Sequence, residues 1–413
     1  MKRDRNPIVV ALLMVMALLV SACGADGGET TTTTGEASTT TTAGSGETPS
    51  EGYKLGFVAS LSGPGSVFAD QGIQSVELAI AQIKEEGILN GDIELITADD
   101  AGDPRTSDQV CNRLINEEGV DAIIGFQNSA NREGCLPAAT RAGTPYLYAT
   151  PYEGLECAPN FFVLGEVPIQ QVDPLVRFMV EDQDSQKWFL TGSDYVAMRG
   201  GNAFAEGVID ELGAEVVDEQ YAPLDTTDFA PLIDTILRSG ADTAFVSFLG
   251  TDFIAFLQQW SDTPGTDAVK AATFGIPIGA ADEAITDLYT AFSYFPSIDN
   301  EANDRYKAGL EEMFGADAQT PSILSVVNYD AVWLWALAVQ QAGTAEPDAV
   351  NAALKEVTFD GPRGPIVFND QGHPELPMYV AILNDEPLKG TEEIIGELPP
   401  ADPGDQADDD CDA

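Results

Sequence analysis

Basic residues and histidine are scarce in this chain of 413 residues. Lysine and arginine together number 19 against 68 aspartate and glutamate residues, and the formal net charge is −49. Such a surface repels nucleic-acid phosphates and anionic lipid headgroups, so neither is an expected partner. The single histidine, His373, lies in a turn-like segment, and no Gly-x-Ser-x-Gly motif occurs. We therefore do not expect an enzyme, and an extracellular hydrolase is the rival interpretation that this scarcity disfavours.

Long apolar runs are scarce as well. One run, between residues 7 and 20, follows three basic residues and precedes Ser-Ala-Cys23. It is too short to span a bilayer, and this pattern is typical of an export signal. A cysteine directly after the cleavage site is typical of a bacterial lipoprotein. We expect a signal peptide over residues 1–22 and a lipid anchor on Cys23, which places the protein at the outer face of the bacterial cytoplasmic membrane. An ordinary secreted protein is the alternative.

The flanking segments lack apolar side chains. Residues 23–52 carry the lipidated cysteine and then threonine runs mixed with Gly, Ser and Glu, which predicts a solvated tether. Residues 391–413 are acidic, contain several prolines and predict a flexible tail. The part between them is long enough for two domains, and we find no second apolar run there that could cross a bilayer.

Cysteines are few. Apart from Cys23 there are four, Cys111, Cys135, Cys157 and Cys411, and their spacing fits no zinc pattern. We expect neither a metal site nor a cofactor. In an oxidising compartment four thiols allow three pairings, and the spacing does not choose between them.

Short apolar strands alternate with amphipathic helices from residue 53 onward. One series places strands at residues 53–60, 93–98, 120–125 and 146–149, and a second at 187–191, 215–220, 243–248 and 271–275. Such alternation predicts parallel sheets covered by helices on both faces, and two series predict two lobes. Ligands bind beyond the carboxyl ends of such strands, here between the lobes. Three more helices, near residues 300–314, 328–341 and 348–356, precede a hairpin-like pair at 365–368 and 378–383.

Five segments resemble the type I periplasmic binding proteins, the leucine/isoleucine/valine-binding family, and among them most closely the amide- and urea-binding branch. They are GFQNSANREGCLP (125–137), YATPYEGLECAPN (148–160), GSDYVAMRGGN (192–202), PLDTTDF (223–229) and YFPSIDN (294–300), in the family's order. The resemblance implies an α/β fold of two doubly wound parallel-sheet lobes joined by three hinge crossings, near residues 165–168, 295–297 and 358–361. Lobe I then comprises residues 53–165 plus 299–357, and lobe II residues 166–298 plus 358–390.

The family's role is to capture a small solute and deliver it to the permease of an ABC transporter. For this chain the resemblance implies a small amide, a urea-like compound or an amino acid as the ligand. The alternative is a ligand-sensing receptor module of the same fold that acts on a separate signalling partner.

The resemblance also implies ligand-binding residues. Ser129 opens a helix after a buried strand, where its hydroxyl and nearby N–H groups can hold a carbonyl or carboxylate oxygen, or simply cap the helix. Tyr148 and Thr150 end the next strand, and a core tyrosine and a turn threonine are the plainer alternatives. Tyr195 is expected to point from lobe II into the cleft, or else to pack on its own strand.

Other positions depart from the amide-binding pattern. Gln127 and Ala197 stand where those proteins tend to carry aromatic side chains, which indicates a larger or more polar ligand than urea. Thr251 and Asp252 are weaker candidates, because an acid in the first turn of a helix also complements the helix dipole. The ammonium of an amino acid would need a lobe II carboxylate from Asp252, Asp194 or Glu283.

The implied fold favours one cysteine pairing. Cys111 and Cys135 lie on predicted helices that follow successive strands and pack side by side, so we expect them to form a disulfide. Cys157–Cys411 is a weaker expectation. Reduced, buried thiols are the alternative for each.

Overall fold

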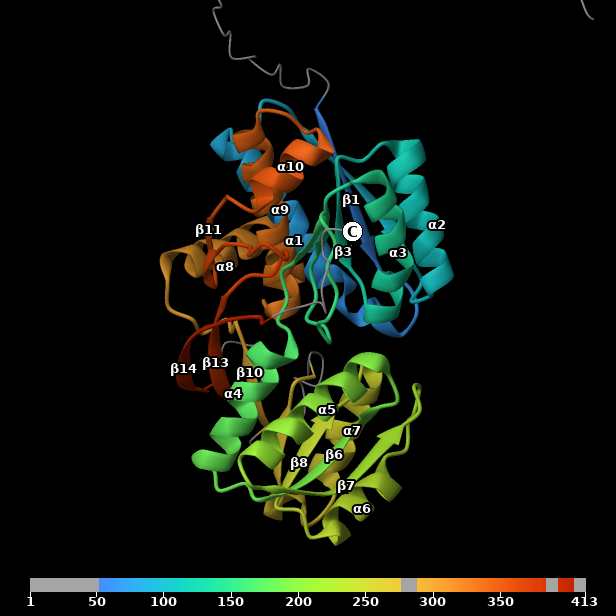
Figure 1. The fold of residues 1–413 in the computed structure, drawn as a ribbon, viewed down its shortest axis with the longest axis vertical. Coiled ribbons are helices and arrows are strands. Elements are labelled where there is room, and N and C mark those ends of the chain that lie inside the picture. The colour runs from blue at the N-terminus through green and yellow to red at the C-terminus, as the bar shows by residue number, and fades with distance from the viewer. Residues whose placement is uncertain (1–51, 276–287, 384–392, 405–413) are drawn as a thin grey trace, which may run out of the picture. The chain divides into compact units, whose positions relative to one another are not determined.

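The computed structural model describes residues 52–275, 288–383 and 393–404, all within a single compact unit of the chain (Figure 1). The predicted signal peptide, the anchor Cys23 and the tether lie outside these residues, as do Glu283 and Cys411.

The first sheet is fully parallel and follows the predicted series. Its five strands run in the order β2-β1-β3-β4-β5. The paired residues, for example Tyr53 beside Ile93 and Leu55 beside Ala122, keep the strands in parallel register. The strands are β1 (Tyr53–Ala59), β2 (Ile93–Asp99), β3 (Ala122–Phe126), β4 (Tyr146–Tyr148) and β5 (Phe161–Val163).

Helices cover both faces of this sheet because its buried strands are apolar on both sides. Leu55 and Phe57 of β1 face a core shared with α1 and α9, whereas Val58 faces a second core shared with α2 and α3. We call the sheet and these helices lobe I (Figure 1). The helices are α1 (Ala69–Glu86), α2 (Pro104–Arg113), α3 (Ser129–Ala142), α8 (Glu301–Phe314), α9 (Ile323–Ala342) and α10 (Pro347–Leu354).

The helix α9 corrects one expectation from the sequence. Its 20 residues are long and apolar enough to cross a membrane by length and composition, although no second such run was expected. Within the structure, 89% of its most apolar window is buried, and α9 packs against α1. The apolar character of α9 therefore fits the central helix of lobe I.

The second sheet repeats the first and then extends it. Its order is β14-β13-β10-β9-β8-β6-β7. The part β7-β6-β8-β9-β10 repeats the order β2-β1-β3-β4-β5 of the first sheet. The strands β13 and β14 add an antiparallel edge, so the sheet of lobe II is mixed rather than wholly parallel. The strands are β6 (Lys187–Ser193), β7 (Glu215–Ala222), β8 (Thr243–Ser247), β9 (Lys270–Thr273), β10 (Leu288–Phe292), β13 (Leu376–Leu383) and β14 (Glu393–Ala401), and the helices are α4 (Pro168–Glu181), α5 (Val196–Glu211), α6 (Ala230–Ser239) and α7 (Thr251–Asp262).

The C-terminal part differs from the prediction in two ways. The expected hairpin does not form, because β12 (Gly364–Ile366) pairs with β11 (Phe359–Gly361), which contacts α9 of lobe I, while β13 joins the lobe II sheet. The third crossing therefore follows β12 instead of preceding it. Within the expected flexible tail, residues 393–401 form the edge strand β14, whose backbone pairs with β13.

Glycines allow close backbone approaches at two crossings between the lobes. A Cβ atom on Gly165, after β5, would lie 2.2 Å from the backbone nitrogen of Pro151. Gly372 has a φ of 75°, and a Cβ atom there would lie 2.1 Å from the carbonyl oxygen of Phe161. Both positions thus exclude larger residues, and Gly372 also accepts a hydrogen bond from Val163 N–H at 2.8 Å.

Candidate ligand-binding site

A cavity of about 460 Å³ lies at the carboxyl ends of the parallel strands of both lobes. In lobe I most of its lining comes from the segments after β1, β3 and β4, and in lobe II from those after β6, β7, β8 and β9. This is where doubly wound sheets place ligands, because the loops after neighbouring strands diverge there. The predicted position of the site between the two lobes therefore matches the cavity.

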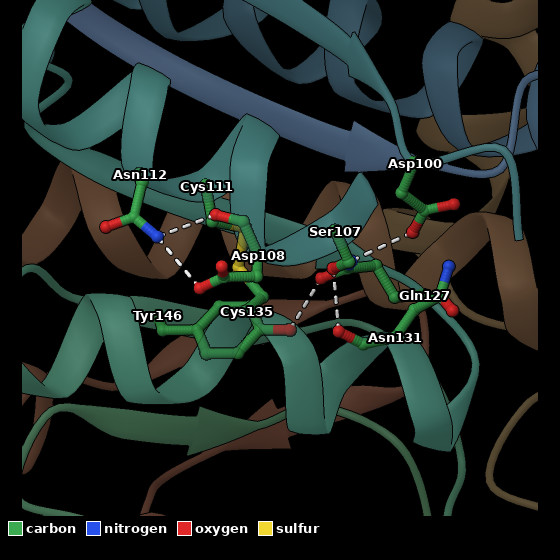
Figure 2. Close-up of a disulfide and its surroundings, with 9 residues drawn as sticks. All are labelled: Asp100, Ser107, Asp108, Cys111, Asn112, Gln127, Asn131, Cys135 and Tyr146. Carbon is green, nitrogen blue, oxygen red and sulfur yellow. Dashed lines mark hydrogen bonds between the residues drawn. A yellow bond between two sulfur atoms is a disulfide. The ribbon is translucent and has the colours of Figure 1, made fainter. Parts of the chain in front are cut away.

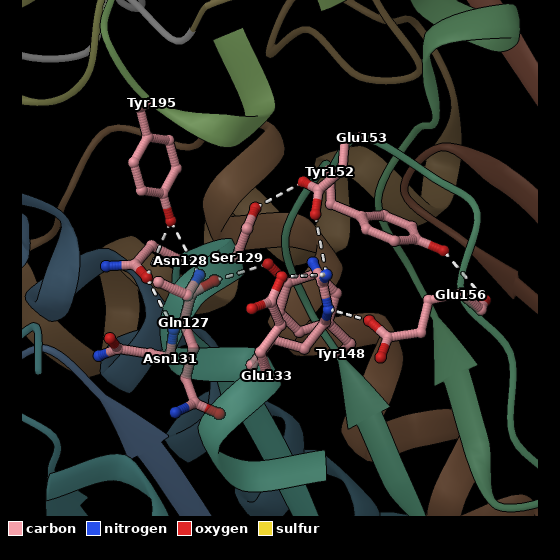
Figure 3. A network of polar contacts seen from close by, with 12 residues as sticks. Gln127, Asn128, Ser129, Asn131, Glu133, Tyr148, Tyr152, Glu153, Glu156 and Tyr195 are labelled. Carbon is pink, nitrogen blue, oxygen red and sulfur yellow. Dashed lines mark hydrogen bonds and ion pairs between the residues drawn. The ribbon is translucent and has the colours of Figure 1, made fainter. Parts of the chain in front are cut away.

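The N-terminus of α3 is the first polar feature of the cavity. Asn128 caps the helix, and its Oδ1 accepts a hydrogen bond from Asn131 N–H at 2.9 Å. The hydroxyl of Tyr195, from lobe II, accepts a hydrogen bond from Ala130 N–H at 2.9 Å and donates one to Asn128 Oδ1 at 3.1 Å (Figure 3). Tyr195 thus points into the cavity, as expected, and connects the two lobes across it.

Ser129 begins α3, and its hydroxyl is already paired within the protein. Its Oγ donates a hydrogen bond to Glu153 Oε2 at 2.6 Å (Figure 3). Arg132 Nη2 lies 2.8 Å from Glu153 Oε1, and Arg132 Nε lies 2.5 Å from Glu156 Oε2. The Arg132 side chain is 3% exposed, and its guanidinium lies 4.7 Å from the centre of the Tyr152 ring. A buried guanidinium held by two carboxylates therefore lies behind the lobe I wall.

Sequence reasoning missed Glu153 and Arg132. The only available signal for Glu153 was its position after the same strand as Tyr148 and Thr150. Burial lowers the pKa of Arg132, but Tyr148, Glu153 and Glu156 raise it more strongly, and the net shift is upward. Burial also raises the pKa of Tyr148 well above its usual range, so its hydroxyl remains a hydrogen-bond donor at neutral pH.

Tyr148 and Thr150 both line the cavity. The Tyr148 hydroxyl donates to the Gln127 carbonyl oxygen at 2.8 Å, so the tyrosine also holds the segment after β3 in place. Thr150 Oγ1 is buried and has no hydrogen-bond partner in the structure. Among the predicted site residues that line the cavity, Thr150 is therefore one whose hydroxyl has no partner within the protein.

Gln127 is among the residues that line the cavity, but its side-chain amide already has partners within the protein. Its side-chain Nε2 donates to Asp100 at 2.9 Å and Ser107 at 2.7 Å, and its Oε1 accepts from Tyr146 at 2.7 Å (Figure 2). Only 2% of the residue is exposed. Because these buried partners already use its amide, Gln127 supports the cavity instead of offering its side chain to a ligand.

Of the weaker ligand-binding candidates in lobe II, Asp252 lines the cavity, whereas Thr251 and Asp194 do not. Asp252 lines the cavity, is 5% exposed, and accepts a hydrogen bond from Asp225 N–H at 3.0 Å. Burial raises its pKa above the ordinary value. Thr251 is exposed and does not line the cavity, since as the first residue of α7 it lies away from it. Asp194 also lies outside the lining and pairs with Arg199 at 2.7 Å.

Aromatic side chains make up much of the remaining wall. Ala197 and its neighbour Met198 line the cavity, and Ala197 stands at the position where the amide-binding pattern predicts an aromatic ring. Other rings replace it, from both lobes: Phe68, Phe126, Tyr152, Phe248 and Phe274. The cavity is therefore mainly apolar with a few polar groups, which is usual for a small-molecule site.

A disulfide lies beneath this site. Cys111 of α2 and Cys135 of α3 are bonded to each other, with 5.5 Å between their Cα atoms (Figure 2). The predicted bond is thus present, and it fixes the helix whose N-terminus lines the cavity. Cys157 is disulfide-bonded too. Its predicted partner, Cys411, lies outside the described residues, so that pairing stays a prediction.

Sequence comparison shows that the chain is similar to periplasmic binding proteins. A family model for periplasmic binding proteins matches residues 52–387. The leucine-, isoleucine-, valine-, threonine- and alanine-binding protein of Pseudomonas aeruginosa is 25% identical over 335 residues, 77% of this chain and 86% of that protein. The Leu/Ile/Val-binding protein of Escherichia coli (strain K12) is 30% identical over 114 residues, 25% of this chain. That match spans only 31% of the Escherichia coli protein.

Solved structures show the same fold. A solute-binding protein of an ABC transporter from R. palustris, in complex with 4-hydroxybenzoate, aligns with a TM-score of 0.75 and 22% identity over 86% of this chain and 99% of that chain. A leucine-binding protein from Thermotoga maritima aligns with a TM-score of 0.70 and 16% identity over 84% of this chain and 98% of that chain. These likenesses support the two-lobed α/β fold.

Proposed function

The chain belongs to the periplasmic binding protein family, and on that premise we propose that it captures a small organic solute between its lobes and delivers it to the permease of an ABC importer. The observation that carries the proposal is the cavity of about 460 Å³ lined by both lobes. A relative named for binding leucine, isoleucine, valine, threonine and alanine, and a structural neighbour in complex with 4-hydroxybenzoate, support a solute of this size. The protein itself carries out no chemical step.

Closure of the lobes is the physical basis of capture. Tyr195 of lobe II bonds to the N-terminus of α3 in lobe I, so the two lobes are already connected across the cavity. A ligand that contacts both lobes binds more tightly to the closed arrangement and increases its population. The permease can then distinguish loaded from empty protein by shape.

The proposal includes membrane attachment through a lipid on Cys23. It is supported by the basic head, the apolar run and the Ser-Ala-Cys sequence at residues 21–23. Detergent-phase partitioning of the protein from its native membrane tests this point. We expect the parent to enter the detergent phase and Cys23→Ser to stay in the aqueous phase, and a parent that stays aqueous contradicts the anchor.

A thermal-unfolding screen of the purified chain tests solute capture. The panel comprises aliphatic and basic amino acids, amines, short amides, urea and hydroxybenzoates. A ligand that binds only the folded state adds about 2.7 kcal/mol at a hundredfold excess over its dissociation constant. Recovery of the unchanged ligand excludes hydrolysis. An unfolding midpoint that no compound in this panel shifts contradicts the proposal.

A further inference from the structure

We infer that the solute is an organic cation, an amine or quaternary ammonium compound with a net positive charge. This inference rests on the proposed function, because it assigns a chemical class to the ligand of that same cavity. It follows from the charges that line the cavity, from the groups already present at the N-terminus of α3, and from the aromatic wall.

All the charged side chains that line the cavity in the described part of the chain are acidic. Glu153, Asp225 and Asp252 line it, and among the described residues no lysine, arginine or histidine does. The nearest guanidinium, that of Arg132, is already paired with Glu153 and Glu156. One buried cation thus faces more carboxylates than it can neutralise, and the cavity keeps a negative potential.

A ligand carboxylate would compete with existing hydrogen bonds at the N-terminus of α3. The N–H of Ala130 donates to the Tyr195 hydroxyl, and the Ser129 hydroxyl donates to Glu153. A bound anion would displace these contacts and would lie against the Glu153 carboxylate. The two negative charges repel each other, and this repulsion is screened less in a partly buried site than in water.

Asp252 is a buried carboxylate without a cationic partner. It is 5% exposed, it accepts a hydrogen bond from Asp225 N–H, and no lysine or arginine in the described part of the chain forms an ion pair with it. A desolvated carboxylate is unfavourable unless it is paired. A protonated amine in the cavity supplies that pairing through a charge-assisted hydrogen bond.

The aromatic wall favours the same class of ligand. Rings attract cations placed over their faces, and the effect grows when the cation is desolvated. Tyr152 already does this within the protein, since the Arg132 guanidinium lies 4.7 Å from its ring centre. The ring of Tyr148, which is also among the lining residues, lies 5.4 Å from the same guanidinium. Carboxylates together with rings therefore match a ligand that combines positive charge with an apolar body.

Calorimetry on the purified chain with matched ligand pairs tests the inference. Lysine is compared with norleucine, and choline with 3,3-dimethylbutanol, so that each pair differs chiefly in the cationic group. We expect at least one cation to bind at least about tenfold more tightly than the compound of its pair that lacks the cationic group. Its affinity should fall as the salt concentration rises.

The outcomes separate the inference from the proposed function. If norleucine, 3,3-dimethylbutanol or 4-hydroxybenzoate binds as tightly as the cations or more tightly, the inference of a cationic ligand is wrong. The proposal that the protein captures a solute is then unaffected. An absence of binding by every compound in the wider panel overturns both.

Variants locate the charge. Asp252→Asn is expected to reduce the preference for the cation over its isostere about tenfold, because it removes one buried carboxylate. Glu153→Gln tests the lobe I side independently. Glu94→Gln, an exposed acid on β2 outside the cavity, serves as the matched control and should leave the preference unchanged. A preference that survives both cavity variants overturns the inference.

Discussion

Replacing Asp330 by asparagine removes the charge that balances Arg363 in the middle of the structure. Asp330 lies on α9, and its Oδ2 is 2.7 Å from Arg363 Nε, with both side chains 0% exposed. Arg363 Nη1 donates to Ser293 Oγ at 2.9 Å, and Nη2 donates to the Leu164 carbonyl oxygen at 2.7 Å. One guanidinium thus connects α9 to the segments that follow β5 and β10, where the chain passes between the lobes.

The expected cost of Asp330→Asn is large because the guanidinium cannot reach water. Breaking a buried ion pair by removing one partner typically destabilises a protein by roughly 3–5 kcal/mol. That is a substantial part of an ordinary stability of about 5–15 kcal/mol. The double variant Asp330→Asn/Arg363→Met leaves no buried charge. We therefore expect it to be destabilised less than the sum of the two single variants, by at least about 1 kcal/mol.

Urea denaturation followed by tryptophan fluorescence measures these differences. Trp335 on α9 and Trp188 on β6 are both buried, so the signal reports on each lobe. The exposed pair Arg238–Asp234 provides the control, since its side chains are 68% and 59% exposed. We expect Asp234→Asn to change the unfolding free energy by less than about 1 kcal/mol. An Asp330→Asn variant within about 1 kcal/mol of the parent would refute the reasoning.

Three further predictions concern the cavity and the third crossing. Tyr195→Phe removes two hydrogen bonds that hold the lobes together, so the closed arrangement becomes less favourable and ligand affinity measured by calorimetry should fall by roughly 1–2 kcal/mol. Thr150→Val removes a buried hydroxyl that has no partner in the ligand-free protein, so ligand binding should weaken by roughly 1–3 kcal/mol without loss of stability. Burial lowers the pKa of His373 from 6.5 to about 4, so the folded protein resists its protonation. The stability due to His373 should be complete above pH 6.5 and should be lost as the pH falls through 4, by up to roughly 3 kcal/mol in urea titrations.

Each of these predictions has a contradicting result. A Tyr195→Phe protein with parental affinity would mean that the lobe contact is irrelevant to capture. Parental affinity in Thr150→Val would show that the free hydroxyl does not touch the ligand. For the pH dependence, the control is His373→Gln, in which the unfolding free energy should change less with pH between pH 4 and 6.5. If it changes as much as in the parent, groups other than His373 cause the pH dependence.

Strands and helices with many local apolar contacts were predictable from periodicity alone. The spacing of Val76, Ala79 and Ile83 indicates the inner face of α1, and all three side chains are buried. The strand β14 was missed because residues 393–401 contain acids and two prolines and pair with β13 along one edge only. Edge strands tolerate prolines that central strands exclude, so composition pointed to a tail where backbone pairing forms a strand.

The candidate site was predictable only as far as strand ends determine it. Tyr148, Thr150 and Tyr195 line the cavity because they end or follow parallel strands whose carboxyl ends meet there. The direction of the Gln127 side chain depends on partners 19 to 27 residues away, which no local pattern reveals. Likewise, Arg132 and Glu153 are 21 residues apart and meet only in the folded protein.

One hydrogen bond connects the cavity wall to the third crossing. The Tyr152 hydroxyl lies 2.7 Å from His373 Nε2, and the two rings stack with 5.9 Å between their centres. Tyr152 lines the cavity, and His373 lies in the segment between β12 and β13 that joins the lobes. Because the Gln371 carbonyl oxygen, 3.0 Å from His373 Nδ1, can only accept, Nδ1 carries the ring proton and Nε2 accepts a hydrogen bond from the Tyr152 hydroxyl. We therefore expect a ligand that displaces Tyr152 to disturb this contact with the segment that joins the lobes, and thereby to bias the arrangement of the lobes.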